Sequence, residues 1–141
     1  MDRSASAVWH GSIKEGKGTI STESGVIKDQ QYSFKTRFED GIGTNPEELI
    51  AAAHAGCFTM ALSGQLTSAE MVPDTLETTA VVTMKHLEEG PTVTRIHLIT
   101  KAKVPNADPK KFAELANKAK EVCPMSRLLK AAEITLDAQL V

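Results

Sequence analysis

Hydrophobic and polar residues alternate in the first part of the chain in a way that predicts short β-strands. Ala5–Lys14 and Gly18–Thr22 are half-alternating, and the Glu-Gly-Lys-Gly between them is typical of a hairpin turn. A third strand is predicted at Gln31–Phe38, where aromatic residues fall on one side and charged residues on the other. Because side chains alternate across a strand, this pattern directs Arg37 away from the aromatic face.

The segment Thr44–Leu66 has the features of a helix. Asn45 can cap its start, Pro46 suits the first helical position, and Glu48 stands where a capping box needs an acidic residue. Beyond this entrance, apolar residues surround most of the helix. Such a pattern predicts burial in the core or in a subunit interface.

The remaining pattern predicts a long hairpin, a second helix and a last strand. Leu76–Val104 is rich in Val, Thr and Ile and is divided near Gly90, which indicates two antiparallel strands. Asp108 and Pro109 then suit the N-cap and first position of a helix, and Glu133–Val141 alternates as a strand. This order predicts an α+β fold with helices on one side of antiparallel β-sheet.

Length and composition narrow the function classes. A chain of 141 residues fits a single domain, residues 1–141, that can bury its own core. A net charge of −2 offers no basic face to phosphates, which argues against a nucleic-acid partner. The first residues lack the apolar run of a signal peptide. We also expect no membrane span, since we find no uncharged apolar stretch of about 18 residues.

These observations predict a cytoplasmic protein. Its two cysteines, Cys57 and Cys123, are then expected to be reduced. If they have a function, they act as reactive thiols or as ligands rather than as a structural bridge.

Cys57, at the centre of the first predicted helix, has three possible roles. Free cysteine is among the most buried residue types, so the sequence alone favours a packing role. A reactive Cys57 would need a cation from another element, because burial raises the pKa of a thiol. A metal site could combine His54 and Cys57 with Cys123 or His97, but no paired Cys-x-x-Cys or His-x-x-x-His occurs, and we expect no metal.

Cys123 lies just before a proline that can begin a new helical turn. Thiols at helix N-termini ionise more readily, which makes a reactive Cys123 plausible, and a buried residue at a helix junction is the alternative. Sequence spacing alone does not show that the two sulfurs meet.

Several motifs together resemble the osmotically inducible protein C (OsmC) family of thiol peroxidases and the related organic hydroperoxide resistance (Ohr) proteins. They are Asn-Pro-Glu-Glu leading to Ala-Gly-Cys-Phe, Thr-Arg-Phe-Glu-Asp upstream, and Cys-Pro-Met-Ser before the last strand. The resemblance covers nearly the whole chain and is greatest to the OsmC branch. It implies an OsmC-like fold of antiparallel sheets with central helices, in an intertwined homodimer with the reactive thiol at the dimer interface.

Carried onto this chain, the resemblance implies roles for four residues. Cys57 matches the peroxidatic cysteine and Cys123 the resolving cysteine. Glu47 matches the glutamate that holds the family's catalytic arginine, for which we choose Arg37. The Ohr branch takes its arginine from an early Gly-Arg motif, where this chain has Gly16-Lys17-Gly18. Glu47 and Cys57 are ten residues apart, which is about 15 Å along a straight helix. Either the helix breaks between them, or a long arginine side chain and a two-fold partner bridge this distance.

The expected activity is reduction of organic hydroperoxides to alcohols by a cysteine-based peroxidase without a cofactor. The Cys57 thiolate would become a sulfenic acid and then a disulfide with Cys123, which an external dithiol would reduce. We expect Phe58, Met60 and their neighbours to provide an apolar lining that favours organic peroxides. Two alternatives on the same fold are a non-catalytic small-molecule binding module and an osmotic-stress interaction protein.

Overall fold

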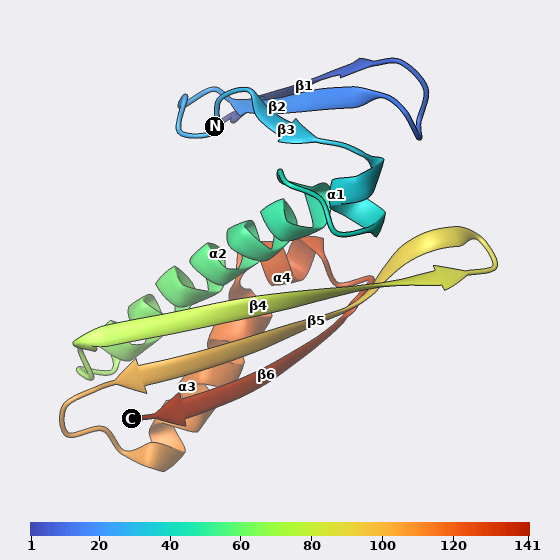
Figure 1. The fold of residues 1–141 in the computed structure, drawn as a ribbon. Coiled ribbons are helices and arrows are strands. Elements are labelled where there is room, and N and C mark those ends of the chain that lie inside the picture. Colours follow the sequence, from blue (N-terminus) through green and yellow to red (C-terminus); the bar gives the residue numbers. More distant parts are fainter. The chain divides into compact units, whose positions relative to one another are not determined.

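The computed structural model describes residues 1–141 and contains six strands and four helices (Figure 1). The chain divides into two units, Met1–Leu49 and Ile50–Val141. In chain order the elements are β1 (Ala5–His10), β2 (Lys17–Thr22), β3 (Gln30–Tyr32), α1 (Phe34–Phe38), α2 (Pro46–Ser68), β4 (Thr75–Leu87), β5 (Gly90–Lys103), α3 (Pro109–Val122), α4 (Pro124–Leu128) and β6 (Glu133–Leu140).

The first unit contains a three-stranded antiparallel sheet in the order β1-β2-β3. Trp9, Gly18 and Tyr32 lie opposite one another across it, and the two aromatic rings are 5.4 Å apart between centroids. A Cβ on Gly18 would lie 2.7 Å from Trp9 Cε3. The close approach of the two rings therefore requires glycine at this position.

The predicted strand at Gln31–Phe38 is wrong beyond its first residues, because β3 ends and the helix α1 follows. Ser33 caps this helix: its hydroxyl accepts a hydrogen bond from the Thr36 backbone N–H, and the Thr36 hydroxyl accepts one from the Ser33 N–H. This reciprocal cap stabilises a helix start that alternation alone does not reveal. Arg37 consequently does not point away from the aromatic residues; its guanidinium lies 5.2 Å from the centre of the Phe38 ring.

The second unit contains the sheet β4-β5-β6. β4 and β5 form the predicted long antiparallel hairpin, and Gly90 at its turn has a positive φ of 119°. β6 pairs with β5 in parallel, so the prediction of an entirely antiparallel sheet is wrong for this pair. The reason is the connection: α3 and α4 lie between the two strands and return the chain to the same end of the sheet.

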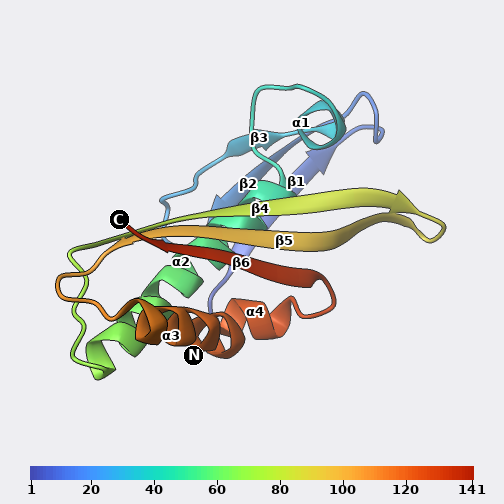
Figure 2. The same cartoon turned by 90° about the horizontal axis from the view of Figure 1, so that it is seen from below.

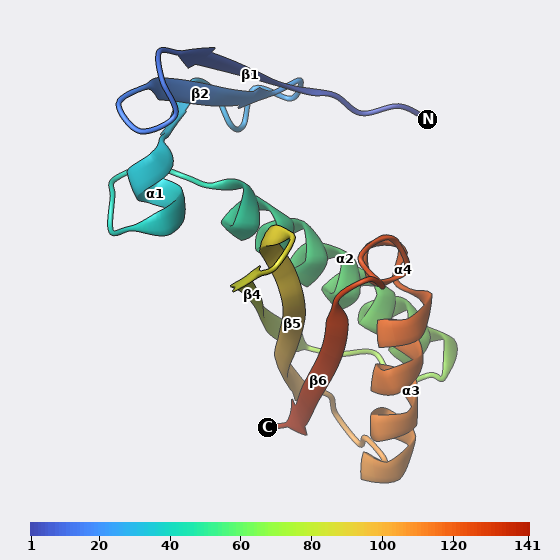
Figure 3. The ribbon, with the colours of Figure 1, turned by 90° about the vertical axis from the view of Figure 1, so that its right-hand side faces the viewer.

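Helices cover one face of this sheet. Figures 2 and 3 show α2 and α3 on the same side of β4, β5 and β6. The core between them is formed by alternate residues of β5 and by one stripe of each helix. Its fully buried members include Phe58, Leu62, Leu66, Leu98, Ala102, Ala116 and Ala119. The mixed helices and small sheets confirm the predicted α+β class.

Both predicted helix starts are confirmed. The Asn45 side chain accepts a hydrogen bond of 2.8 Å from the Glu48 backbone N–H. Glu48 does not complete a capping box, since its carboxylate accepts a hydrogen bond from the Thr44 hydroxyl. In α3, the Asp108 side chain accepts a hydrogen bond from the Lys110 N–H, with Pro109 in the first position.

The expectation that the chain has no apolar stretch of about 18 residues is wrong for α2. α2 has 23 residues and an 18-residue window of mean hydropathy 1.3, so by length and composition it could cross a membrane. One such helix is weak support for a span, because the core helix of a soluble protein can have the same composition. Its Phe58, Leu62 and Leu66 are fully buried against the second unit's own core.

Candidate functional site

The two cysteines meet in the second unit. Cys57 lies in the middle of α2, and Cys123 lies at the junction of α3 and α4, where its backbone N–H donates to the Ala119 carbonyl. Their sulfur atoms are 3.1 Å apart and both residues are free thiols. Cys123 is fully buried, whereas Cys57 is partly exposed. Pro124 begins α4 directly after Cys123, as predicted.

The surroundings of Cys57 favour the thiol over the thiolate. Burial raises the pKa of Cys57, and the adjacent sulfur of Cys123 raises it further. A backbone N–H of Met125 acts in the opposite direction with a smaller effect. A nucleophilic Cys57 therefore needs positive charge from outside this pair.

The residues considered as metal ligands form other contacts. His54 Nε2 is 2.7 Å from Ser126 Oγ, and His97 Nδ1 is 2.6 Å from Thr135 Oγ1. Burial lowers the pKa of His54, which favours a neutral ring. No group of three or more His, Cys, Asp or Glu side chains is arranged to hold a metal ion.

Arg37 and Glu47 form an ion pair in the first unit. The Nε and Nη2 atoms of Arg37 each lie 2.9 Å from one carboxylate oxygen of Glu47. The other oxygen, Oε2, is buried and has no hydrogen-bond partner. The Arg37 side chain is 41% exposed, so the pair contributes little to stability, and the remaining guanidinium N–H groups are free for another ligand.

Arg37 also lines an aromatic cavity of about 260 Å³ in the same unit. Its walls are Trp9, Ile13, Tyr32, Ser33, Phe34, Arg37 and Phe38. Sequence reasoning missed this cavity, although Ser33 and Thr36 at capping-box spacing and Phe34 and Phe38 one turn apart were available signals. Neither Phe58 nor Met60, which were expected to line the site, borders this cavity: Phe58 is fully buried and Met60 is 78% exposed.

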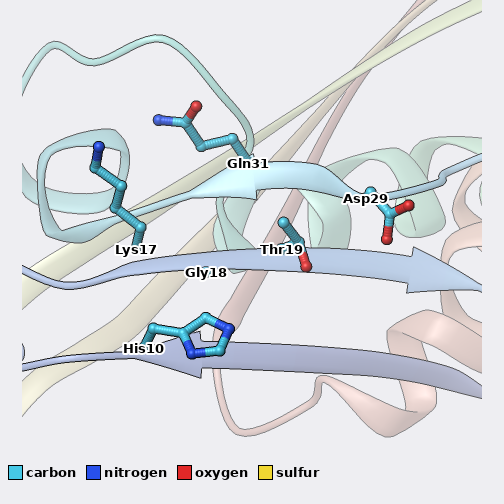
Figure 4. A pocket seen from close by; sticks show the side chains of 6 residues that line it. All are labelled: His10, Lys17, Gly18, Thr19, Asp29 and Gln31. Atoms are coloured by element: carbon cyan, nitrogen blue, oxygen red, sulfur yellow. The ribbon is translucent and has the colours of Figure 1, made fainter.

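Lys17 occupies a different surface of the same small sheet. Together with His10, Thr19, Asp29 and Gln31 it borders a shallow hollow of about 300 Å³ (Figure 4). Successive residues of a strand point to opposite faces, so Lys17 lies on the face opposite the aromatic pair that packs over Gly18. Arg37 is therefore the cation of the aromatic cavity, and Lys17 does not take its place.

The four candidate residues thus form two pairs, Cys57 with Cys123 and Arg37 with Glu47. The pairs belong to different units of the chain. α2 is one continuous helix from Pro46 to Ser68, so the break considered between Glu47 and Cys57 does not occur.

Comparison with known proteins identifies the family. The family model described as OsmC-like protein matches residues 39–138. The chain belongs to the OsmC-like family. It is 51% identical over 140 residues to Peroxiredoxin OsmC of Escherichia coli (strain K12), which covers 99% of this chain and 97% of that protein. It is 32% identical over 110 residues to Organic hydroperoxide resistance protein OhrB of Bacillus subtilis (strain 168), covering 78% of this chain and 79% of that protein.

Solved structures support the OsmC-like fold. The crystal structure of OhrB of Bacillus subtilis superposes with a TM-score of 0.71 at 25% identity, over 98% of each chain. An OsmC-like protein from Mycoplasma pneumoniae gives a TM-score of 0.77 at 14% identity, over 100% of this chain and 98% of that chain. The second similarity concerns the fold alone. The family and the fold predicted from sequence motifs are both confirmed.

Proposed function

We propose that this OsmC-like protein reduces organic hydroperoxides to alcohols with Cys57 as the peroxidatic thiol and Cys123 as the resolving thiol. Its family and its 51% identity to a named peroxiredoxin make it a thiol-dependent peroxidase. The observation that carries the residue assignment is the 3.1 Å contact between the two free sulfurs. A packing cysteine needs no second thiol beside it, whereas a peroxidase that forms a disulfide does.

The reaction follows from this contact. The Cys57 thiolate attacks one peroxide oxygen, the O–O bond breaks, and the alkoxide leaves as the alcohol after taking up a proton. Cys57 is then a sulfenic acid. The Cys123 thiol attacks its sulfur, the S–S bond forms, and hydroxide leaves with the thiol proton as water. An external dithiol reduces the disulfide, and no cofactor takes part.

Arg37 is proposed to provide the positive charge that Cys57 lacks in its own unit. Lowering a thiol pKa from about 8.5 to about 6 raises the thiolate fraction at about pH 7.5 only about tenfold. The lower basicity of the thiolate reduces its nucleophilicity by a similar factor. The larger effect is expected on the departing alkoxide, where a preorganised donor contributes about 3–4 kcal/mol. Glu47 orients the guanidinium and leaves other N–H groups free.

The aromatic cavity supports an organic rather than an inorganic substrate. Its walls place apolar rings around the guanidinium, which suits a hydroperoxide with an alkyl or aryl group. The –OOH group would lie at Arg37, and the organic group would contact rings such as Trp9 and Phe38. We propose that this arrangement favours organic hydroperoxides over hydrogen peroxide.

The proposed working form is a homodimer in the cytoplasm, with both units of each chain acting as one peroxidase domain. On α2, Ala53, Gly56, Met60 and Gly64 follow one another at helical spacing and are exposed. Added Cβ atoms at Gly56 and Gly64 would meet no atom within 4 Å. This face of an apolar helix suits a second copy, which would bring its Arg37–Glu47 pair to the Cys57–Cys123 pair of the first.

Intact mass tests the assignment. One equivalent of tert-butyl hydroperoxide should remove two hydrogens from the reduced protein, and peptide mapping should join Cys57 to Cys123. The Cys57→Ser variant should keep its fold and lose peroxide consumption, because a serine hydroxyl forms no nucleophilic anion near neutral pH. A non-catalytic binding protein would keep the mass of the reduced form. Turnover by Cys57→Ser above half of the parent rate would also rule out the assignment.

A further inference from the structure

A second pair of side chains joins the same two helices as the cysteines. His54 of α2 and Ser126 of α4 are 0% and 5% exposed, and their Nε2 and Oγ atoms are 2.7 Å apart. His54 precedes Cys57 by three residues and Ser126 follows Cys123 by three. Residues three apart are neighbours on a helix surface, so the two contacts lie side by side between the helices.

This pair is costly as a purely stabilising contact. His54 Nδ1 is buried and has no hydrogen-bond partner, whichever way the proton on Nε2 is placed. An apolar pair would fill this part of the core without leaving a polar atom unsatisfied. A hydrogen bond differs from an apolar contact in being directional: it fixes how α4 is rotated and shifted against α2.

The segment around Cys123 needs such a constraint. α4 has only five residues, too few to be stable as an isolated helix, and Cys123 sits at the junction that separates it from α3. Oxidation of Cys57 inserts an oxygen at a sulfur that already lies 3.1 Å from Cys123. The two segments must accommodate this oxygen and still return the Cys123 sulfur to Cys57.

We propose that the His54–Ser126 hydrogen bond positions Cys123 for the resolution step. The inference rests on the proposed function. While Cys57 is a sulfenic acid, the bond holds the start of α4 against α2, so that the Cys123 thiol reaches the sulfenic sulfur before a second peroxide does. His54 and Ser126 contact neither substrate nor the reacting atoms in this role; they are positioning residues.

The consequence is a competition that can be measured. Sulfenic Cys57 either condenses with Cys123, losing water, or is oxidised by a second peroxide to the sulfinic acid, which ordinary thiols do not restore. Ser126→Ala should leave the first oxidation of Cys57 unchanged, because it removes one hydroxyl from a residue outside the reacting pair. It should raise the sulfinic product per turnover about fivefold, the factor that corresponds to one ordinary hydrogen bond.

A second buried hydroxyl provides the control. Thr100 is 1% exposed; its Oγ1 lies 2.9 Å from Thr78 Oγ1 and donates to the Glu77 carbonyl, and all three residues belong to β4 and β5 rather than to the helices that carry the cysteines. Thr100→Val removes a buried hydroxyl at nearly constant volume. It should lower the unfolding temperature as Ser126→Ala does, but leave the sulfinic yield at the parent value.

The experiment measures, for parent and variants, the single-turnover rate of peroxide loss and the sulfinic Cys57 peptide after repeated cycles with tert-butyl hydroperoxide and a dithiol. His54→Leu, and its combination with Ser126→Ala, should give the same sulfinic yield as Ser126→Ala alone, because all three lack one and the same bond. If His54→Leu does not fold, the Ser126 and Thr100 variants are enough to test the proposal.

Equal sulfinic yields in parent and Ser126→Ala, or equal increases in Ser126→Ala and Thr100→Val, would overturn the positioning role. Failure of the parent itself to form the disulfide would instead refute the proposed function.

Discussion

Burial and reactivity make opposite demands on the sulfur of Cys57. The surrounding core and the adjacent Cys123 raise its pKa, yet the proposed chemistry starts from the thiolate. A thiol in these surroundings is mostly protonated at neutral pH, so its rate should rise as pH increases toward its pKa. The positive charge proposed from Arg37 moves this rise to lower pH, and the ion pair with Glu47 keeps that charge in place.

The Arg37→Met variant tests this function of the guanidinium. Loss of the charge should lower kcat/KM for tert-butyl hydroperoxide by about 10²–10³, since the alkoxide loses its donor. The remaining rate should keep increasing with pH above neutrality, where the parent rate has reached its plateau. Stopped-flow measurement of Cys57 oxidation between pH 5 and pH 10 records both effects.

Lys17→Met is the matched control, because it removes a cation of the same unit from the face opposite the aromatic cavity. It should leave kcat/KM within about twofold of the parent, the effect expected of an exposed charge. If Lys17→Met loses as much activity as Arg37→Met, the assignment of the cation to Arg37 is incorrect.

Cys123→Ser separates the roles of the two thiols. The first oxidation of Cys57 should proceed near the parent rate, because that step does not involve Cys123. Without a neighbouring thiol the sulfenic acid should persist, react with an added trapping reagent, and be driven by excess peroxide to the sulfinic form. Peptide mass after stoichiometric and excess oxidant gives the product. A variant as resistant to overoxidation as the parent would mean that the resolving thiol comes from elsewhere.

At the scale of elements, helix starts were predicted best, because there a capping side chain forms a hydrogen bond directly with a backbone N–H. Asn45 and Asp108 each accept a hydrogen bond from a backbone N–H within the first turn of a helix, and Pro46 and Pro109 follow them. These contacts are local, so their residues can be recognised without knowing the fold. The starts of both long helices can therefore be located from the amino-acid sequence alone.

The sequence predicted an element wrongly where its type or direction depends on less obvious or more distant contacts. In Phe34–Phe38 the alternating pattern suggested a strand, but the reciprocal bonds of Ser33 and Thr36 start a helix instead. The direction of β6 depends on where α3 and α4 return the chain, which no residue of β6 encodes. The aromatic cavity was missed for the same reason, since Trp9 reaches it only through the pairing of β1 with β2.

In the candidate site, too, contacts between residues far apart in the sequence could not be predicted from local patterns. The contact between Cys57 and Cys123 could not be derived from their spacing of 66 residues and was expected only from the resemblance to a family. The pairing of Arg37 with Glu47 was expected on the same basis and is present. The His54–Ser126 contact had no sequence signal, because a histidine on an apolar helix does not reveal its partner.

His54 also makes the stability of the second unit depend on pH. Burial lowers its pKa in the folded state, whereas the unfolded chain takes up a proton below about pH 6.5. The unfolded state therefore binds more protons in acid, and stability present above pH 6.5 is lost as the pH falls below it. For one proton the slope cannot exceed about 1.4 kcal/mol per pH unit.

Urea unfolding of the parent and His54→Leu between pH 8 and pH 5 measures this contribution. The free energy of unfolding should fall less on acidification in the variant, because the contributions of all other titrating groups are common to both proteins. A parent and a variant with parallel pH profiles would show that His54 takes up its proton equally in the folded and unfolded states.

At the scale of the whole molecule, the exposed face of α2 remains to be covered. A helix apolar enough to cross a membrane exposes Met60 at 78%, beside Gly56 and Gly64 with open space above them. Exposed apolar surface of this kind suits an interface with another protein, which we propose to be a second copy of the chain. Two copies related by a two-fold axis can cover this face on both chains at once.

Mixed dimers test whether the two residue pairs meet across that interface. As pure dimers, Cys57→Ser is expected to be inactive and Arg37→Met to keep no more than about a hundredth of the parent activity. If Arg37 acts on the partner's cysteine, a dimer of one chain of each kind contains one complete site, formed by the unaltered Cys57 of one chain and the unaltered Arg37 of the other. If Arg37 acts within its own chain, the same mixed dimer contains no complete site.

Unfolding the two variants together and refolding them places half of the dimers in the mixed form. Each mixed dimer then has one complete site out of two if Arg37 acts on the partner's cysteine, so activity should recover to about a quarter of the parent value. Each variant refolded alone controls for gain of activity by refolding, and sedimentation confirms the dimer. Mixtures no more active than their separate components would place Arg37 and Cys57 of one site on the same chain.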